Sequence, residues 1–396
     1  MALSSILQRF NEPETLKMAK LGRELRAQGI DIIDLSLGEP DFDTPEHIKQ
    51  AAVKAVNDNW SHYTPVPGFL DLREAVCAKL KRDNNLDYKP ENIVVSTGAK
   101  QSLANAILAI VDEGEEVIIP TPYWVTYSEL VKIARGKVVE VHTSPEAQFK
   151  ITPQQLEAAI TPKTKAFLFS SPCNPSGAVY SKEELAALAE VLKKHPNIYI
   201  LSDEIYEYIN FIGQHESIAQ FSELKERIVI INGMSKGFAM TGWRIGYTAA
   251  NVEVTKGMEK LQGQFTSGTN AVAQKASVVA LMEDLGATKK MTEEFTRRRK
   301  RVLELVKEVP GITCFEPQGA FYIFPDVSAY YGKSDGQNTI NNAADLCMYL
   351  LNTAHVSSVM GDAFGEPKCV RFSFANSLEN IEKGWARIKE ALAKLK

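Results

Sequence analysis

The chain has 396 residues, and its 44% hydrophobic content is enough for a large core spread over two or three domain-sized units. A formal net charge of -4 argues against nucleic acid as a partner, and five cysteines without a CxxC pair favour a reducing compartment over a disulfide framework. Residues 1–20 carry charges throughout, the longest apolar run is too short for a bilayer, and no His or Cys cluster has metal spacing, so we expect a cytoplasmic protein with no membrane partner and no metal.

The first 43 residues contain no repeated unit of strand and helix. A charged amphipathic segment covers residues 13–28, and a short apolar segment follows at 32–37. An amphipathic helix needs a core on which to bury its apolar face. We expect this region to pack with the C-terminal part of the chain.

Residues 44–284 repeat one pattern, in which a short β-branched run is followed by a turn and a longer helical segment. Such alternation predicts an α/β fold, with a mostly parallel sheet covered by helices on both faces. Ligands of open parallel sheets bind outside the carboxyl ends of the strands, so the residues after each run are candidates for a site. The candidate strands are 93–96, 116–120, 138–142, 166–170, 198–202, 227–232 and 245–250.

From residue 285 onwards the pattern changes to a charged helical stretch at 289–308, followed by short strand-like pieces at 320–324 and 369–374. These elements predict a smaller α+β domain built from both termini, residues 1–43 and 285–396, beside a large domain at 44–284. No long flexible linker separates the two regions, so we expect the domains to be closely joined.

Two candidate strands are followed by groups that suit a phosphate and a flat ring. The turn after 93–96 contains Ala99 and Lys100 and enters a helical run, whose first N–H groups favour an anion. The glycine and lysine spacing is not that of a Walker motif, and a plain strand-to-helix turn is the alternative. Trp124 follows strand 116–120, where it either stacks on a heterocycle or packs in the core.

Asn174 and Asp203 follow the strands at 166–170 and 198–202. The prolines and glycine of segment 171–177 predict a rigid turn that directs the Asn174 amide. Asp203 is a carboxylate at the end of an apolar strand, and its burial requires a cationic or protonated partner. A pyridinium N–H is such a partner, and an aspartate together with a Schiff-base lysine is the arrangement used for pyridoxal 5'-phosphate (PLP).

Three cations complete the constellation. Lys236 follows Ser235 in a glycine-rich segment, where partial burial and a nearby cation would lower the pKa of its amine and make it a better nucleophile. Ser235 and Arg244 suit a phosphate, the arginine through its planar fork. Arg371 lies within the apolar run 370–374, so it requires either a structural carboxylate or a substrate carboxylate.

These motifs, in this order, make the chain resemble the class I aminotransferases of PLP fold type I, and within them the bacterial aspartate aminotransferase subgroup. The similarity runs from Leu-Gly-Glu-Pro-Asp-Phe-Asp-Thr-Pro at 37–45 to Arg-Phe-Ser-Phe-Ala-Asn at 371–376. The Ser-Lys pair at 235–236, followed by Thr-Gly-Trp-Arg-Ile-Gly at 241–246, is highly specific to this family. The resemblance implies ping-pong transamination between an L-amino acid and a 2-oxo acid, with aspartate or glutamate and 2-oxoglutarate or oxaloacetate as the expected pairs.

The resemblance also implies a role for each site residue. Lys236 is the expected catalytic residue, which forms the Schiff base with PLP and carries the proton of the substrate Cα. The other cofactor contacts are expected from Asp203 at the ring nitrogen, Tyr206 and Asn174 at the ring oxygen, Trp124 on the ring face, and Ala99, Lys100, Ser235 and Arg244 at the phosphate. The substrate is expected to lie beside Trp124, with its α-carboxylate at Arg371, Asn174 and the backbone of Gly38. Tyr63 matches a tyrosine that reaches the phosphate of the neighbouring subunit, which implies a homodimer with shared active sites.

Two positions bear on the expected substrate side chain. Lys100 faces the distal carboxylate of a dicarboxylic substrate in the resembled subgroup, whereas in the alternative it serves only the phosphate or lies in solvent. Glu14 stands where that subgroup often has a small hydroxyl residue, and a carboxylate there would repel a dicarboxylate. Aromatic amino acids, prephenate, a PLP-dependent C–S β-lyase activity and a non-catalytic PLP-binding regulator therefore stay open beside aspartate.

Overall fold

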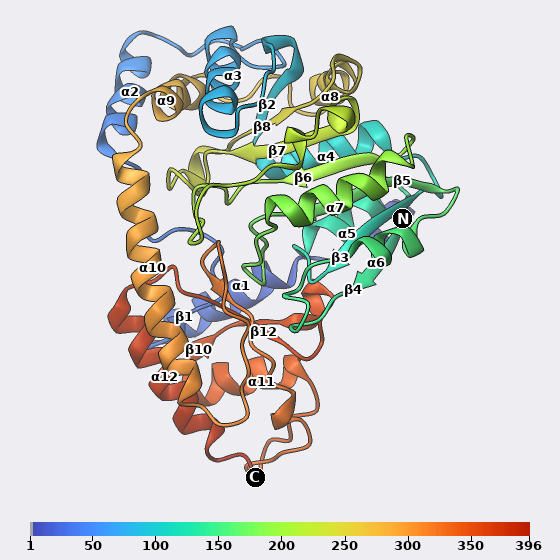
Figure 1. Ribbon diagram of the computed structural model, residues 1–396. Helices are drawn as coiled ribbons and strands as arrows, with labels where there is room; N and C mark the ends of the chain where they lie inside the picture. The colour runs from blue at the N-terminus through green and yellow to red at the C-terminus, as the bar shows by residue number, and fades with distance from the viewer. Residues whose placement is uncertain (1–2) are drawn as a thin grey trace.

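The computed structural model describes residues 3–396, so residues 1 and 2 of the predicted smaller domain lie outside it. A seven-stranded sheet crosses the molecule in the order β2-β8-β7-β6-β5-β3-β4 (Figure 1). Its strands are β2 (Ile93–Thr97), β3 (Glu116–Thr121), β4 (Lys137–His142), β5 (Thr164–Ser170), β6 (Tyr199–Asp203), β7 (Ile228–Gly233) and β8 (Ile245–Ala249). The predicted α/β fold with a mostly parallel sheet is confirmed, and each predicted strand is present at its expected place.

One strand departs from the parallel pattern. β8 runs antiparallel to both of its neighbours, β2 and β7. The connection from β7 to β8 contains only a short 3-10 turn at Thr241–Trp243, whereas a parallel crossover needs a dozen or more residues. This short connection, residues 234–244, carries Lys236 and Arg244.

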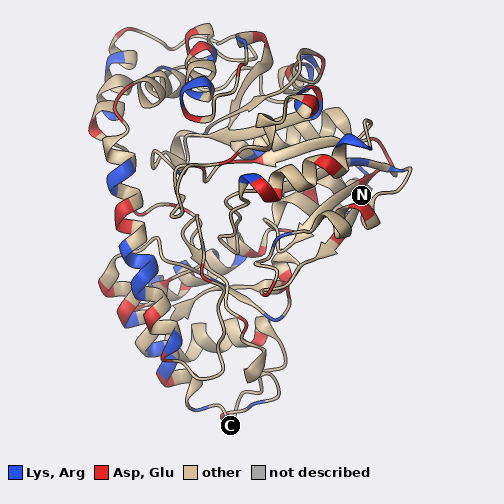
Figure 2. Ribbon diagram, in the orientation of Figure 1, with Lys and Arg blue, Asp and Glu red and all other residues tan. Residues whose placement is uncertain are grey.

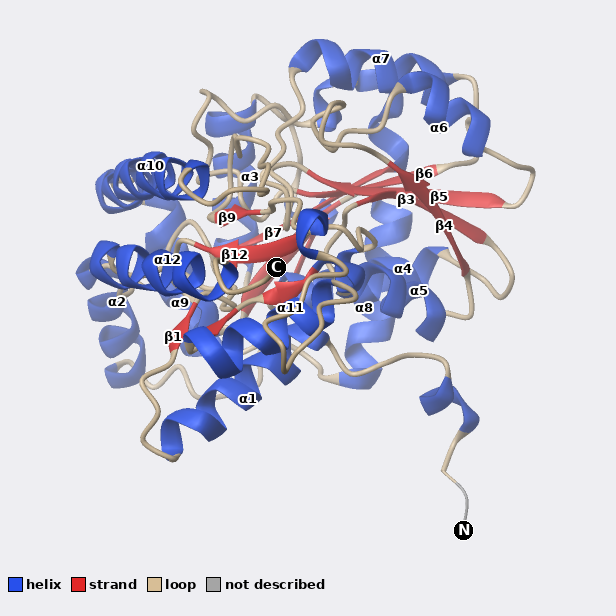
Figure 3. Ribbon diagram, turned by 90° about the horizontal axis from the view of Figure 1, so that it is seen from below, coloured by secondary structure: helices blue, strands red, loops and turns tan. Residues whose placement is uncertain are grey.

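Alternate residues of the strands enter two separate cores, one on each face of the sheet. Val94 and Val117 pack with α4, α5 and α8, whereas Val95 and Ile118 pack with helices of the opposite layer. Figure 3 shows the sheet between these two helical layers. The helices are α2 (Glu46–Asn57), α3 (Leu70–Asn84), α4 (Ala99–Ile110), α5 (Thr126–Ile133), α6 (Pro153–Ala159), α7 (Lys182–Lys193), α8 (Val252–Phe265) and α9 (Ala271–Met282).

A further core combines both ends of the described chain. Met18 and Ile33 pack there with Phe372 and Trp385. Its elements are α1 (Glu14–Ala27), β1 (Ile33–Asp34), α10 (Gly286–Lys307), β9 (Tyr322–Ile323), α11 (Ala343–Tyr349), β10 (Val356–Ser357), β11 (Val359–Met360), β12 (Val370–Ser373) and α12 (Leu378–Leu392). β1 pairs with β10 in parallel, and β11, β12 and β9 form an antiparallel sheet. The exact domain boundaries stay a prediction.

The helix α10 contacts both regions of the molecule. Near its beginning, the Thr288 hydroxyl donates to the carbonyl of Gly237 at 2.7 Å, next to Lys236. Further along, Val302 packs in the core that joins the two ends of the chain. Between these contacts, Arg298 donates to a carboxylate oxygen of Asp41 at 2.6 Å. The helix therefore ties the lysine loop, segment 38–41 and the smaller unit together.

Charged residues of both signs are distributed over the outer helices, and α10 carries both along its length (Figure 2). No helix within residues 3–396 is both long enough and apolar enough to cross a membrane.

Candidate active site

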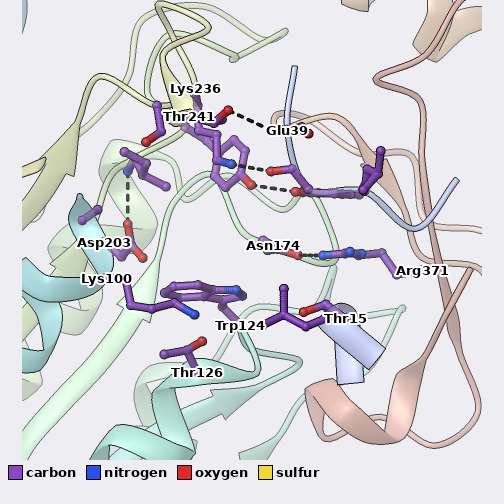
Figure 4. Close-up of a pocket in the computed structure, with 18 of the residues that line it drawn as sticks. Thr15, Glu39, Lys100, Trp124, Thr126, Asn174, Asp203, Lys236, Thr241 and Arg371 are labelled. Carbon is purple, nitrogen blue, oxygen red and sulfur yellow. Dashed lines mark hydrogen bonds between the residues drawn. The ribbon is translucent and has the colours of Figure 1, made fainter. Parts of the chain in front are cut away.

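A cavity of about 460 Å³ lies at the carboxyl ends of the parallel strands (Figure 4). Its walls come from the residues after β2, β3, β5, β6 and β7, and also from α1, segment 36–39, β9 and β12. Predicted site residues from both regions of the chain line it together: Gly38, Ala99, Lys100, Trp124, Asn174, Asp203, Tyr206, Ser235, Lys236, Arg244 and Arg371. Tyr63 is the predicted site residue that does not line this cavity, and its side chain is fully exposed.

The amine of Lys236 points into this cavity. It donates a hydrogen bond to the carbonyl of Gly38 and lies 5.8 Å from the ring centre of Tyr206. Loss of hydration lowers the pKa of the amine to about 8, although the carboxylate of Glu39 opposes the shift. A lysine with this pKa is unprotonated far more often at neutral pH than an exposed one, so it is suited to attack a carbonyl carbon.

Asp203 ends β6 with its carboxylate buried. One oxygen accepts the hydroxyl of Tyr127 at 2.6 Å, and the other accepts the N–H of Ile205 at 3.2 Å. Burial raises the pKa of this carboxyl to about 6, and the hydrogen bond from Tyr127 limits the rise. No ion pair within residues 3–396 includes Asp203, so a cationic group in the cavity would stabilise its charged form.

A pocket for an anion forms where α4 begins beside β8. The N–H groups of Ala99 and Lys100, the first two residues of α4, are not used in the helix and point towards its N-terminal end. Arg244 reaches over them and donates to the carbonyl of Thr97 at 3.4 Å. A Cβ at Gly246 would lie 2.2 Å from the nitrogen of Ala99, so only glycine allows this close approach. Burial lowers the pKa of Lys100, and the positive charge of Arg244 lowers it further.

Arg371 is 2% exposed, yet it contacts no carboxylate among the described residues. Its guanidinium donates to the side-chain oxygen of Asn174 at 3.0 Å and to the carbonyl of Ser36 at 2.7 Å. Its Nε has no partner within residues 3–396. Of the two alternatives drawn from the sequence, a structural carboxylate is therefore wrong, and the guanidinium can accept an anion from the cavity.

Residues 30–388 match the family model described as aminotransferase class I and II. The chain belongs to this family. It is 43% identical to the aspartate/prephenate aminotransferase of Nitrosomonas europaea over 99% of this chain and 100% of that protein. It is also 43% identical to the aspartate aminotransferase of Bacillus subtilis over the full length of both. Among solved structures, the aspartate aminotransferase of Rhizobium meliloti superposes with a TM-score of 0.96 at 41% identity, covering all of both chains.

As a PLP-dependent aminotransferase, the chain must hold an aldehyde, a pyridine ring and a phosphate, and the cavity fits all three. Lys236 supplies an amine of lowered pKa, and Asp203 a buried carboxylate with no cationic partner within residues 3–396. The beginning of α4 and Arg244 supply donors for a phosphate. Trp124 also lines the cavity, with the amine of Lys100 5.0 Å from its ring centre.

The prediction that Glu14 faces the substrate side chain is wrong. Glu14 is absent from the cavity wall and pairs with Lys17 at 3.6 Å, whereas its neighbour Thr15 lines the cavity. Because successive helical residues point about 100° apart, the register of α1 turns position 14 away and positions 15, 19 and 23 inward. The predicted repulsion of a dicarboxylate therefore has no basis in the structure.

Sequence reasoning missed several residues of the cavity wall. Arg23 and Thr15 share one face of α1 with Ala19, and the four-residue spacing was the signal that could have found them. Tyr322 lies between Phe321 and Ile323, where nothing in the sequence distinguishes it from a core residue, and Tyr127 lies between Thr126 and Ser128 with no pattern that marks it as part of a site. Glu39 accepts the hydroxyl of Thr241 at 2.8 Å and so joins segment 36–39 to the lysine loop.

One buried group outside the cavity wall has the chemistry of a metal site. Glu204, Glu207 and His215 bring their ligand atoms within 4.8 Å of one another. However, the buried amine of Lys79 pairs with Glu207, and His215 lies 3.0 Å from Glu204. Each carboxylate thus already has a basic side chain beside it within the described residues.

Proposed function

We propose that this aminotransferase exchanges the amino group between a dicarboxylic L-amino acid, aspartate or glutamate, and the matching 2-oxo acid. The observation that carries this proposal is the charge of the cavity wall. Basic side chains outnumber acidic ones there, with Arg23, Lys100, Lys236, Arg244 and Arg371 against Glu39 and Asp203. A site of this charge favours substrates with two negative groups over neutral amino acids.

Three of the basic residues have a function without any substrate side chain. We propose that Lys236 holds the cofactor covalently, that Arg244 with Ser235 and the N–H groups of α4 binds its phosphate, and that Arg371 binds the α-carboxylate of the substrate with Asn174 and Gly38. Lys100 and Arg23 then have no assigned function. Their positive charges would attract a second carboxylate on the substrate.

The surroundings of Arg23 support the same assignment. The other basic residues of α1 have partners: Lys17 lies 3.6 Å from Glu14, Lys20 lies 4.0 Å from Glu24, and Arg26 donates to the carbonyl of Ile32. The side chain of Arg23 has no hydrogen bond or ion pair among residues 3–396, and it lines the cavity. It is thus the cation of this helix that remains available to a substrate.

When bound, PLP supplies an aldehyde that links to amines and a protonated ring that accepts an electron pair. Asp203 would keep the ring nitrogen protonated through its buried negative charge, and Tyr206 and Asn174 would hold the ring oxygen as hydrogen-bond donors. The amine of Lys236 would serve as the general base that removes the proton from the substrate Cα and as the general acid that later returns it. Its pKa of about 8 suits both directions of transfer near neutral pH.

Prephenate is a second candidate acceptor. Relatives from Nitrosomonas europaea and Cereibacter sphaeroides, 43% and 44% identical, are named aspartate/prephenate aminotransferases. In this chain Thr15 and Arg23 are two turns apart on α1, about 12 Å along the helix, and both line the cavity. A wall of this length suits a dicarboxylate larger than aspartate as well as aspartate itself.

We also propose a homodimer in which Tyr63 of each subunit completes the other active site. Tyr63 is fully exposed, and Trp60 and Leu70 on the same segment expose 39% and 53% of their surface. Apolar side chains gathered in this way favour contact with another protein surface.

The proposal is tested by half-reactions of the PLP-loaded protein with a panel of amino acids, followed by absorbance. We expect aspartate and glutamate to react at least about 10-fold faster than alanine or phenylalanine, and Lys236→Ala to abolish turnover. Arg23→Gln and Lys100→Met should weaken the dicarboxylates selectively, whereas the matched change Lys20→Gln on the same helix should not. Release of pyruvate from cystathionine without a 2-oxo acid would instead identify a β-lyase, and inactivity with every amino acid would identify a regulator.

A further inference from the structure

Tyr322 lines the cavity, although none of the roles above requires it. Its side chain is buried, and its hydroxyl lies 2.8 Å from the hydroxyl of Tyr206. The guanidinium of Arg371 lies over the same ring, 4.4 Å from its centre. One side chain thus contacts both a residue assigned to the cofactor and the residue assigned to the substrate carboxylate.

The strand pairing places Tyr322 there. Ser373 of β12 lies opposite Tyr322 of β9, and Arg371 is two residues before Ser373, so it projects from the same face of the sheet. The entry to β9 is fixed to another wall of the cavity, because the N–H groups of Gln318 and Gly319 both donate to the carbonyl of Gly177, at 2.7 and 2.9 Å. That carbonyl belongs to the turn that carries Asn174. Tyr322 therefore has little freedom to move away from its two contacts.

We propose that Tyr322 is a positioning residue with two separable functions: its hydroxyl orients Tyr206 towards the cofactor, and its ring orients Arg371 towards the substrate carboxylate. The inference rests on the proposed function, since it takes the roles of Tyr206 and Arg371 from there. It adds the residue that couples the two.

The hydroxyl function follows from counting donors. Tyr206 is 4% exposed, and Tyr322 is its side-chain hydrogen-bond partner among the described residues. A tyrosine hydroxyl has one hydrogen to donate and accepts through its oxygen. If Tyr206 donates to the ring oxygen of PLP, Tyr322 must be the donor of the bond between them. Removal of the Tyr322 hydroxyl takes away the hydrogen bond that orients the hydroxyl of Tyr206 and deprives its oxygen of a donor.

The ring function follows from the bonds that Arg371 lacks. Its guanidinium has two acceptors, one on Asn174 and one on Ser36, and neither carries a charge. The faces of Tyr322 and Phe364 enclose it at 4.4 and 5.0 Å. An aromatic face attracts a cation without using its N–H groups, so these groups stay available to a carboxylate. A smaller aliphatic side chain at position 322 would let the guanidinium tilt.

Two variants separate these functions. Tyr322→Phe removes the hydroxyl and keeps the ring, whereas Tyr322→Leu removes both. For each variant we would measure the dissociation constant of PLP and, in the PLP-loaded protein, the dissociation constant of maleate as a non-reacting dicarboxylate. The matched control is Tyr330→Phe, because Tyr330 is also buried but bonds to the carbonyl of Pro310 and does not line the cavity.

We expect Tyr322→Phe to weaken PLP binding by about 3- to 10-fold and to leave maleate binding unchanged. Tyr322→Leu should weaken PLP to the same extent and also weaken maleate by about 3- to 30-fold. Tyr330→Phe should change neither constant.

The proposal is overturned if Tyr322→Phe binds PLP as tightly as the wild type, or if both variants weaken maleate equally, since a merely structural residue would produce the second result. Failure of the proposed function gives a different pattern. In that case the wild-type protein neither binds maleate nor reacts with aspartate, while the effect of Tyr322→Phe on PLP is still measurable.

Discussion

Lys236 and Asp203 illustrate how one cavity shifts two groups in the direction that each requires. Both lose hydration, and this loss disfavours whichever form is charged. The pKa of the Lys236 amine therefore falls to about 8, and that of the Asp203 carboxyl rises to about 6. The lysine becomes a nucleophile near neutral pH, while the carboxylate requires a positive partner that the cofactor ring would supply.

The depressed pKa of Lys236 predicts a pH-dependent penalty on stability. Below about pH 8 the native cofactor-free protein holds a proton on a poorly hydrated amine, and this lowers the free energy of unfolding. Between about pH 8 and 10.5 only the unfolded chain binds that proton, so the loss of stability becomes smaller as the pH rises through this range. We expect Lys236→Met to raise the free energy of unfolding by about 1–3 kcal/mol at pH 7 and to change it little at pH 10.5. Urea unfolding at the two pH values measures this. An equal difference at both would show that the charge of the amine is not the cause.

Asp203 leads to a second prediction, which concerns cofactor binding. The carboxylate must be ionised to attract the ring, so PLP affinity should fall as the pH drops through about 6. The hydroxyl of Tyr127 favours the charged form, and Tyr127→Phe should therefore move the midpoint of this loss to higher pH. PLP titrations of the cofactor-free protein between pH 5 and 8 measure the midpoint. A midpoint unchanged from the wild type would exclude Tyr127 from this role.

At the scale of elements, the phosphate pocket depends on how closely β8 approaches the beginning of α4. A Cβ at Gly246 would lie 2.2 Å from the Ala99 nitrogen, and neither backbone can retreat without breaking the pairing of β8 with β2. We expect Gly246→Ala to cost about 1–3 kcal/mol of stability and to weaken PLP binding.

The same loop offers a control for that prediction. A Cβ at Gly242 would meet nothing within 4 Å, so Gly242→Ala should change the free energy of unfolding by less than about 0.5 kcal/mol. Thermal unfolding and PLP titration of both variants decide the matter. If Gly246→Ala changed neither the free energy of unfolding nor PLP affinity, the close approach of β8 to α4 would not be needed for the phosphate pocket.

Helices and strands could be predicted from the sequence where their hydrophobic pattern was clear. The inner strands of the central sheet stand out because both of their faces are buried, so each is a nearly continuous hydrophobic segment, whereas the edge strand β4 is partly exposed and carries Lys137 and Glu140. The antiparallel direction of β8 was not predicted, since direction depends on the length of a connection rather than on the strand itself. The inward face of α1 was also missed by one residue at Glu14, because a one-position shift rotates a helical side chain by about 100°.

Site residues were predictable when their chemistry conflicted with their surroundings. A carboxylate after an apolar strand and an arginine within one, Asp203 and Arg371, both require a partner, and this requirement is visible in the sequence. Tyr322 presents no such conflict, because a tyrosine among Phe321 and Ile323 is an ordinary core residue. Its position against Tyr206 depends on a pairing between β9 and β12 that no local pattern specifies.

At the scale of the whole molecule, the proposed dimer predicts complementation between two defective subunits. Lys236→Ala subunits lack the amine but keep Tyr63, and Tyr63→Ala subunits have the reverse defect. In a mixed dimer, one site would combine Lys236 of the second subunit with Tyr63 of the first. We expect unfolding and refolding of the mixture to restore up to about half of the wild-type activity per hybrid dimer.

Each variant alone is the control for the complementation. The Lys236→Ala protein should stay inactive after the same treatment, and the Tyr63→Ala protein should keep its own weakened activity. A mixture whose activity equals the average of the two would mean that each site is complete within one chain. The cytoplasmic location expected from composition stays a prediction at this scale.

The contacts of α10 have a consequence for motion. The helix α10 is continuous over 22 residues and contacts both regions, so a rotation of the smaller unit would also displace the part of the helix that holds the lysine loop. Arg298 would transmit this displacement to Asp41, three residues beyond the Gly38 carbonyl that receives the Lys236 amine. Closure of the two regions over a substrate would then also displace the Gly38 carbonyl, which accepts the hydrogen bond of the Lys236 amine. Binding of the substrate carboxylate and release of the amine would in this way be coupled.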